Sequence, residues 1–142
     1  MATREQQVRA SFSKQSFMTT LGAKLTKVSK GKIEILLPFS KNLTQQNGYT
    51  HAGAIATILD TACGYAALTE APEDKDVLTV EFKVNLLAPA VGESFVAKAQ
   101  VKKSGRTLTV CTADAYAISK GSEKLVATMQ ATIIALPIKP AK

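Results

Sequence analysis

The chain has 142 residues, which is the length of one domain with a sizeable core and too short for two. Hydrophobic residues make up 46% and charged residues 20%, a balance that excludes an intrinsically disordered chain. The formal net charge of +7 suits an anionic partner, but few aromatic residues and no nucleic-acid-binding motif accompany it, so we expect no nucleic-acid partner.

Two features of the sequence bear on the cellular compartment. The first 15 residues, MATREQQVRASFSKQ, lack the apolar segment of a signal peptide, and no apolar run approaches the ~20 residues that cross a bilayer. Cys63 and Cys111 are far apart and lie among apolar residues, which favours buried reduced thiols over a disulfide or a zinc site. We therefore expect a cytoplasmic protein without a membrane partner.

The N-terminal third predicts one helix and one hairpin. Residues 3–16 contain helix-forming residues, with Val8 and Phe12 four positions apart, and predict a short N-terminal helix. Residues 22–38 alternate apolar and polar on both sides of Lys30 and Gly31, which is typical of a β-hairpin. Pro38 should end its second strand.

From about Thr50 to Leu68 the apolar period changes from two to 3.6 and predicts one long helix. Thr50 is a suitable N-cap residue, because its hydroxyl can accept a bond from an amide of the first turn. The residues predicted to face the core are Ile55, Ile58, Leu59, Ala62 and Ala66.

After this helix, alternation returns in four segments and predicts four more strands, which we expect to form a meander. With the hairpin they give about six antiparallel strands and one amphipathic helix. The predicted fold class is α+β, with the sheet wrapped around the helix. The segments are VLTVEFKVNLLAPAVG, SFVAKAQVKKSG, RTLTVCTADAYAISKG and EKLVATMQATIIAL.

Motifs for common cofactors are absent from the sequence. It contains no GxGxxG, Walker A, HExxH or GxSxG pattern. Its single histidine, His51, cannot build a multi-histidine metal site within one chain. We therefore predict no metal and no cofactor, and His51 and Asp60 remain as the residues that could carry chemistry.

Asp60 stands in the middle of the predicted helix, too far from its start for a capping role. Residues 51–69 contain no lysine, arginine or glutamate, so this helix lacks an ordinary charged face. A carboxylate in such surroundings is costly to desolvate unless it is hydrogen-bonded or functional. We expect Asp60 to lie buried or in a cleft, against the small neighbours Ala56, Thr57, Cys63 and Gly64.

His51 and Asp60 cannot form a catalytic pair within one subunit. Nine helical residues separate them by roughly 13 Å of rise and about half a turn of rotation. If both serve one site, a second copy of the chain must supply one of them. An isologous dimer would do so twice by symmetry.

The segment QQNGYTHAGAIATILD, residues 45–60, resembles the signature of hotdog-fold acyl-CoA thioesterases of the PaaI-like, phenylacetic-acid-degradation group. In that group a Gln or Asn precedes the histidine by six residues, a glycine precedes it by three, HGG opens the central helix, and a carboxylate follows nine residues later. Gln45, Gly48, His51, Gly53 and Asp60 match this pattern. The resemblance extends from about residue 21 to the end and includes NLLAPA, residues 85–90.

This resemblance implies a single hotdog domain over residues 1–142 that hydrolyses acyl-CoA thioesters. It implies a homodimer with active sites at the interface and a further assembly into a homotetramer. The amide of Ala52 would polarise the thioester carbonyl, and Asp60 of the other subunit would act as general base or nucleophile. Gln45 would orient the thioester or water, His51 would hold the helix start or the carbonyl, and Thr79 would help to position water.

One departure and two alternatives accompany the resemblance. Ala52 replaces the second glycine of HGG, which leaves the amide in place but puts close backbone approach or an unusual φ in question. A hotdog hydratase or dehydratase would space its Asp-His pair differently, and a non-catalytic acyl-CoA-binding protein would leave Asp60 idle.

The residues expected to contact substrate are Asn47, Gly48, Gly53, Lys103 and Arg106, with Lys102 as a further candidate for the phosphates of coenzyme A.

Overall fold

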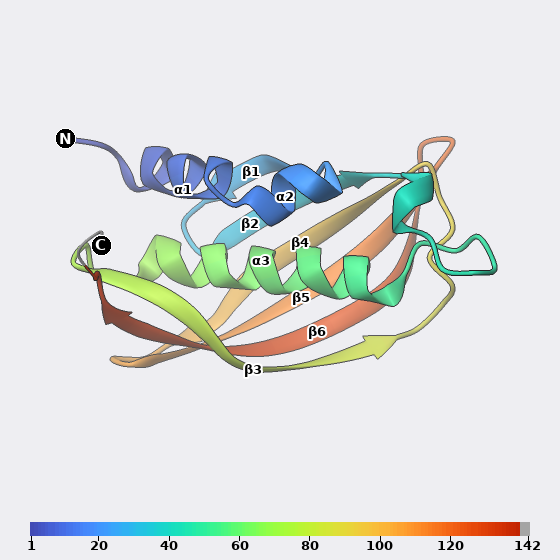
Figure 1. Cartoon of the computed structure of the whole chain (residues 1–142). Helices are drawn as coiled ribbons and strands as arrows, with labels where there is room; N and C mark the ends of the chain where they lie inside the picture. Colours follow the sequence, from blue (N-terminus) through green and yellow to red (C-terminus); the bar gives the residue numbers. More distant parts are fainter. Residues whose placement is uncertain (140–142) are drawn as a thin grey trace.

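One long helix, α3 (Ala52–Glu70), lies across the inner face of a curved six-stranded antiparallel sheet (Figure 1). The structure is a computed structural model that describes residues 1–139. This architecture confirms the predicted α+β fold of a helix wrapped by a sheet. The other elements are α1 (Arg4–Ser13), α2 (Ser16–Leu21), β1 (Lys24–Ser29), β2 (Lys32–Pro38), the 3-10 helix η1 (Lys41–Leu43), β3 (Lys75–Leu86), β4 (Ser94–Ser104), β5 (Leu108–Ser119) and β6 (Ser122–Pro137).

The apolar stripe of α3 is buried as predicted, from Ile55 to Ala66. The predicted N-cap is wrong by one residue, because the helix begins at Ala52 and His51 caps it. Thr50 belongs instead to an extended segment that bridges to Thr44, and its amide donates to the carbonyl of Ala90 at 3.1 Å. The hydroxyl of Thr50 is buried without a hydrogen-bond partner among residues 1–139.

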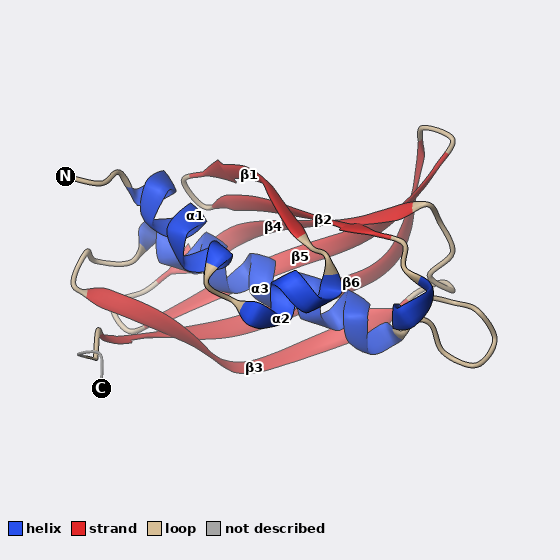
Figure 2. Ribbon diagram, turned by 45° about the horizontal axis from the view of Figure 1, so that its top comes forward, coloured by secondary structure: helices blue, strands red, loops and turns tan. Residues whose placement is uncertain are grey.

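The strand order is β1-β2-β4-β5-β6-β3, and Figure 2 shows β3 at the opposite edge from β1. Strands β4, β5 and β6 form the expected meander, but its extension to β3 is wrong, because β3 pairs with β6 and not with β4. The connecting loop passes across the ends of β6 and β5, where Leu87 donates to Val126 and Glu93 donates to Ile118 through the backbone. Alternation within a strand does not encode which neighbour it takes, so the sequence left this open.

A β-bulge at Val80 shifts the register of β3 between Thr79 and Glu81. Before the bulge Thr79 faces α3, opposite the buried Ile133, and after it Phe82 lies opposite the buried Ala131. An unbulged strand would turn one of these two side chains away from the helix, because side chains alternate with period two. The bulge therefore lets both halves of β3 face α3.

The single N-terminal helix predicted over residues 3–16 is two helices, because the chain breaks at Lys14 and Gln15. A capping box between Thr3 and Gln6 starts α1. Phe12 packs against the ring of Tyr65 on α3, with ring centroids 6.0 Å apart. The N-terminal helices thus lie over the outer side of α3 and shape the surface beside it.

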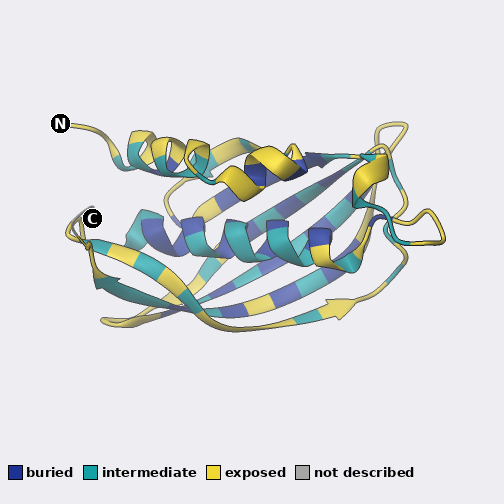
Figure 3. Ribbon diagram, in the orientation of Figure 1, coloured by how far each residue is buried: buried dark blue, intermediate teal, exposed yellow. Residues whose placement is uncertain are grey.

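Burial follows the two periodicities, with alternate strand residues and one side of α3 in the core (Figure 3). Both cysteines are free and buried, as predicted. The expectation that no apolar segment reaches membrane-spanning length is wrong by length and composition, since α3 has 19 residues and an 18-residue window within it has a mean hydropathy of 1.2. The sheet encloses this helix and 56% of the apolar window is buried within the protein, as in the core helix of a folded domain.

Candidate active site

A tight turn in front of α3 positions the first group of predicted residues. The amide of Gly48 donates to the carbonyl of Gln45 at 3.0 Å, and Gly48 has a φ of +85°, which favours glycine. The side-chain oxygen of Gln45 accepts from the amides of Asn47 and Tyr49. This use of the oxygen fixes the side chain, while its amide nitrogen has no acceptor among residues 1–139.

His51 is the N-cap of α3, and its ring Nδ1 accepts from the amide of Gly53 at 2.7 Å. In this arrangement the ring proton lies on Nε2. A Cβ at position 53 would lie 2.9 Å from Nδ1, so the cap requires glycine there. The amide of Gly53 is thereby occupied within the chain, which differs from the substrate contact expected for it.

The amide of Ala52 is the free donor at the helix start. The next two amides are bonded, that of Gly53 to the His51 ring and that of Ala54 to the His51 carbonyl at 3.0 Å, whereas that of Ala52 has no acceptor among the described residues. Ala52 is helical and has no positive φ, so the absence of the second glycine of HGG introduces no strain. A free amide at a helix N-terminus attracts anions and developing negative charge.

Ala52 lines a pocket of about 410 Å³ together with Gln45 and the loop after β3. Its walls are mainly apolar. His51 and Gly53 face a separate, smaller hollow beside α2, so the four predicted residues at the helix start divide between two sides. The larger pocket is lined by Gln45, Tyr49, Thr50, Ala52, Ile55, Leu86, Leu87, Ala88, Pro89, Ala90 and Val126.

Asp60 and Thr79 meet on the other side of α3. The hydroxyl of Thr79 donates to Oδ1 of Asp60 at 2.7 Å, which leaves Oδ2 free of partners among the described residues. Asp60 is half-buried and lines a second pocket of about 380 Å³, in agreement with the predicted cleft position. The pocket lies between α3, the start of β3 and the N-terminal helices.

Within one chain His51 and Asp60 face different pockets, as the helical geometry predicts, and the Ala52 amide also lies apart from Asp60. Asp60 and Thr79 line one pocket, whereas Gln45 and Ala52 line another. Lys102, Lys103 and Arg106 are exposed at the β4–β5 hairpin, and none of them lines a pocket with Asp60 or Ala52. A site that uses both groups therefore needs a second subunit.

The buried cysteines are poor candidates for a nucleophile, although Cys63 lies one helical turn from Asp60. Burial raises the pKa of the Cys63 thiol, and the charges of Cys111 and Asp60 raise it further. Burial, followed by the charge of Glu70, also raises the pKa of Cys111 to about 12. Both thiols stay protonated near neutral pH, and the thiolate is the reactive form.

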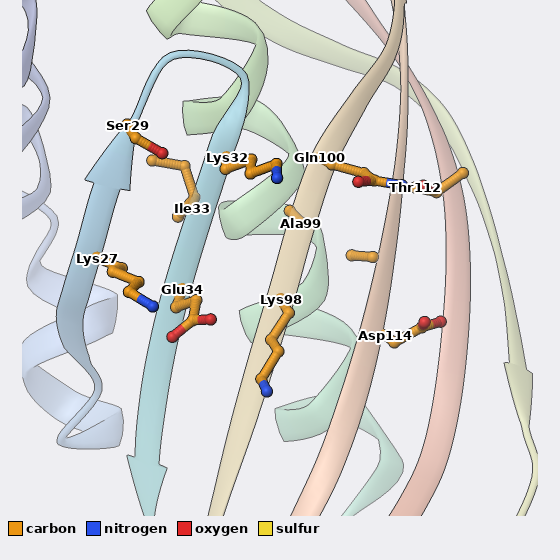
Figure 4. Close-up of a pocket in the computed structure, with 11 residues that line it drawn as sticks. Lys27, Ser29, Lys32, Ile33, Glu34, Lys98, Ala99, Gln100, Thr112 and Asp114 are labelled. Atoms are coloured by element: carbon orange, nitrogen blue, oxygen red, sulfur yellow. The ribbon is translucent and has the colours of Figure 1, made fainter.

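A third hollow, of about 410 Å³, lies on the outer face of the sheet across β1, β2, β4 and β5 (Figure 4). Its rim mixes Lys27, Lys32 and Lys98 with Glu34 and Asp114. Lys98 also pairs with Glu123 at 3.2 Å. This mixture of charges selects no ligand class, and no predicted site residue lies there.

His51→Ala should lower the free energy of unfolding by about 1 kcal/mol, because alanine leaves the Gly53 amide without its capping acceptor. His51→Asn should recover most of this loss, since asparagine is a good N-cap residue. Urea unfolding of the three proteins measures the difference. Equal stabilities of the wild type and the alanine variant would contradict a capping role.

Comparison with known proteins gives a family match over the part of the chain that contains the candidate site. The family model described as the Thioesterase superfamily matches residues 47–123, from the turn before His51 through β5 and into β6. The chain belongs to the Thioesterase superfamily.

Relatives of this superfamily member agree over most of the chain. A thioesterase family protein from Silicibacter pomeroyi has 52% identity and a TM-score of 0.92, with 94% of this chain and 98% of that chain covered. The PaaI protein from the phenylacetic acid degradation operon of E. coli, at 17% identity and a TM-score of 0.83, covers 94% of this chain and 93% of its own and shows the hotdog fold.

A curated relative from Saccharolobus solfataricus, named "Putative esterase", is 31% identical over 63% of this chain. The chain spans 64% of that relative's length. The match therefore supports membership of the superfamily more directly than any particular activity.

The sequence alone did not identify every residue that lines the pockets of this protein. It selected Thr79 only through the resemblance, because a threonine in a strand carries no signal of its own. It missed Tyr65, Ser11 and Gln15, which line the pocket of Asp60 from α3 and the N-terminal helices. Their juxtaposition depends on how α1 packs on α3, which no local pattern encodes.

Proposed function

We propose that this chain hydrolyses acyl-CoA thioesters at sites shared between the two subunits of a homodimer. The observation that carries the proposal is the unpartnered amide of Ala52 at the start of α3, in the same fold as the half-buried Asp60–Thr79 pair. One group can stabilise an oxyanion and the other can deliver a nucleophile. A merely acyl-CoA-binding protein would carry the same free amide and leave the carboxylate idle, so turnover distinguishes the two.

The edge strand β3 supports a homodimer. It is 12 residues long, and its apolar side chains are unusually open, with Leu78 62%, Val80 57% and Leu86 56% exposed. A long edge with free backbone groups and exposed apolar side chains is a template for pairing with another strand. A second copy of β3, in antiparallel orientation, would pair with these backbone groups and cover the exposed apolar side chains.

Symmetric pairing would join the two half-sites. If the twofold axis passes through the middle of β3, residues 76–79 lie opposite residues 82–85 of the partner subunit. On β3, residues 76–79 line the pocket of Asp60, and Leu86 at the end of the strand lines the pocket of Ala52. Asp60 of one subunit would then face Ala52 and Gln45 of the other, and a homotetramer of two such dimers stays a prediction.

The reaction would begin with the thioester carbonyl bonded to the Ala52 amide. Asp60 would either take a proton from water as the water attacks the carbonyl carbon, or attack that carbon itself and form an anhydride that water then opens. In both routes the carbon–sulfur bond breaks, the thiolate of coenzyme A leaves and takes up the proton that water gives up, the free acid forms, and the Asp60 carboxylate is regenerated. Thr79 would hold Asp60, while the amide of Gln45 would orient the thioester or the water.

The charge of the chain suits such a substrate. Coenzyme A carries phosphates, and the net charge of +7 favours an anionic ligand. Lys102, Lys103 and Arg106 are exposed on one hairpin, where they could bind these phosphates without desolvation. An acyl-CoA substrate also agrees with the cytoplasmic location that the sequence predicts.

The proposal is tested by thiol release from short, medium, long and aryl-acetyl CoA thioesters with wild type, Ala52→Pro and Ala52→Gly. Proline suits the first position of a helix, and His51 before it is already extended, with ψ of 136°. Ala52→Pro should therefore fold but lose about 100-fold in kcat, since it removes the donor.

Ala52→Gly is the matched control, because it keeps the amide and should retain activity within a few fold of the wild type. Circular dichroism and size-exclusion chromatography should show both variants folded with the wild-type assembly. Wild type that releases no thiol from any substrate would overturn the proposal. A fully active Ala52→Pro variant would remove the amide from it.

A further inference from the structure

The pocket of Asp60 continues along α3 beyond the carboxylate. Its helical wall consists of Asp60, Thr61, Gly64, Tyr65 and Leu68, which lie at one side of the helix. The rise from residue 60 to residue 65 is about 7.5 Å, the reach of a short acyl chain or a single ring. At the far end the wall passes to Ser11 and Gln15 from the N-terminal helices.

Gly64 leaves room in the middle of this pocket. A Cβ built at this position would have no atom within 4 Å, so no packing within the described chain requires glycine. Glycine in a helix interior is less favourable than alanine by about 1 kcal/mol in general. The open space beside Asp60 is therefore suited to a ligand group that passes over Gly64.

The far end of the pocket is polar, and the charge of Asp76 also acts on Tyr65 there. Tyr65 is only 5% exposed, and its hydroxyl accepts from the side-chain amide of Gln15 at 2.7 Å and is bonded to the hydroxyl of Ser11 at 3.0 Å. Burial raises the pKa of Tyr65 above its usual value, so the phenol stays neutral. The three groups form a small network that α1 and the start of α2 hold against α3.

This network has hydrogen-bonding capacity left over. The Ser11–Tyr65 bond uses one of two hydroxyl protons, and neither hydroxyl has another acceptor among residues 1–139. The amide oxygen of Gln15 has no donor in the same part of the chain. A part-buried network with one free donor and one free acceptor matches a ligand hydroxyl, which can both accept and donate.

The charges that line the pocket further restrict the class of acyl group that it can bind. Asp60 and Asp76 both line the pocket, and no lysine or arginine does. A carboxylate at the remote end of an acyl group would lie between like charges in a partly desolvated space. The pocket should thus disfavour dicarboxylic acyl groups.

We propose that Ser11, Gln15 and Tyr65 form the polar end of an acyl pocket that starts at Asp60 and passes over Gly64. This inference rests on the proposed thioesterase function and names its substrate class. The preferred substrates carry an uncharged hydroxyl on the acyl group, remote from the thioester. The N-terminal helices are then part of the specificity apparatus and not only a cover for α3.

The test compares kcat/KM for matched pairs of alkyl and ω-hydroxyalkyl CoA thioesters with butanoyl, hexanoyl and octanoyl chains, together with acetyl-CoA and adipoyl-CoA. At the best chain length the wild type should prefer the hydroxylated member by about threefold to tenfold. Adipoyl-CoA should react more slowly than hexanoyl-CoA. Tyr65→Phe should bring the hydroxyl-to-alkyl ratio close to one.

Tyr116→Phe is the matched control, because Tyr116 lies on the outer face of the sheet beside Lys98. It should keep the wild-type ratio. Gly64→Ala supplies a second variant that suits a helix better than the wild type does, so it should fold. The added methyl should lower kcat/KM for the hexanoyl and octanoyl pairs by roughly tenfold. Acetyl-CoA is too short to reach Gly64 and should be affected much less.

The outcomes separate this inference from the function beneath it. Thioester hydrolysis with no preference for the hydroxylated members, or with a preference that survives Tyr65→Phe, would overturn the inference alone. A Gly64→Ala variant with an unchanged chain-length profile would show that the acyl group does not pass over Gly64. No thiol release from any acyl-CoA would overturn the proposed function, and the acyl pocket with it.

Discussion

Asp60→Asn should lose about 1000-fold or more in kcat for every acyl-CoA that the wild type hydrolyses, because the amide can neither take a proton from water nor attack the carbonyl. The fold should survive the change. Thr79 donates to Oδ1 of Asp60, and an asparagine keeps an oxygen acceptor in that place. Thiol release measured beside urea unfolding separates the loss of activity from any loss of stability.

A second aspartate in the chain offers a closely matched control. Asp114 also accepts from a threonine hydroxyl, that of Thr128 at 2.6 Å, but it lies on the outer face of the sheet. Asp114→Asn makes the same chemical change in the same kind of hydrogen bond and should leave kcat within a few fold of the wild type. If Asp60→Asn is as active as Asp114→Asn, the carboxylate of Asp60 has no catalytic role.

The parts of the fold that follow from local periodicity were predictable from the sequence. The buried stripe of α3 and the hairpin at Lys30 and Gly31 result from side-chain spacing and from a glycine at φ of +73°. Even the conclusion that His51 and Asp60 point to different sides needs only helix geometry. These features were confirmed because each depends on residues close in sequence.

The features that the sequence did not predict arise from contacts between distant residues. Strand β3 takes β6 as its neighbour because its connecting loop crosses the ends of two strands, and alternation along β3 carries no trace of that path. The bulge at Val80, which lets both Thr79 and Phe82 face α3, is equally unpredictable from the sequence. The cap at His51 was missed because threonine is the commoner capping residue, whereas Thr50 is engaged in a bridge.

In the candidate site, too, the sequence predicted which residues take part but not the contacts that they make. The helical pattern identified Asp60, and the resemblance added Gln45, Ala52 and Thr79. The structure adds the hydrogen-bonding state of each group: a free amide at Ala52, an occupied amide at Gly53, and a carboxylate oxygen held by Thr79. These states give different roles to neighbouring residues that the motif treats alike. The amide of Gly53 serves the cap of His51, while the amide of Ala52 has no acceptor among the described residues.

Two inactive variants should restore each other's activity if the site is shared between subunits. Equal amounts of Asp60→Asn and Ala52→Pro, unfolded together and refolded, should form about half heterodimers by random association. Each heterodimer holds one site with both changes and one site with neither. The mixture should therefore regain about a quarter of the wild-type activity per subunit, a rise of about 25-fold over Ala52→Pro and about 250-fold over Asp60→Asn.

The double variant distinguishes shared sites from sites within one subunit. Asp60→Asn combined with Ala52→Pro in one chain, mixed equally with wild type, inactivates both sites of every heterodimer. Activity should fall to about a quarter of that of an all-wild-type sample, since only wild-type homodimers remain active. Sites contained within one subunit would instead retain half of the activity, and the two single variants would show no recovery when mixed. Because the single chain places Asp60 and Ala52 in separate pockets, we expect recovery in the first mixture and the deeper loss in the second.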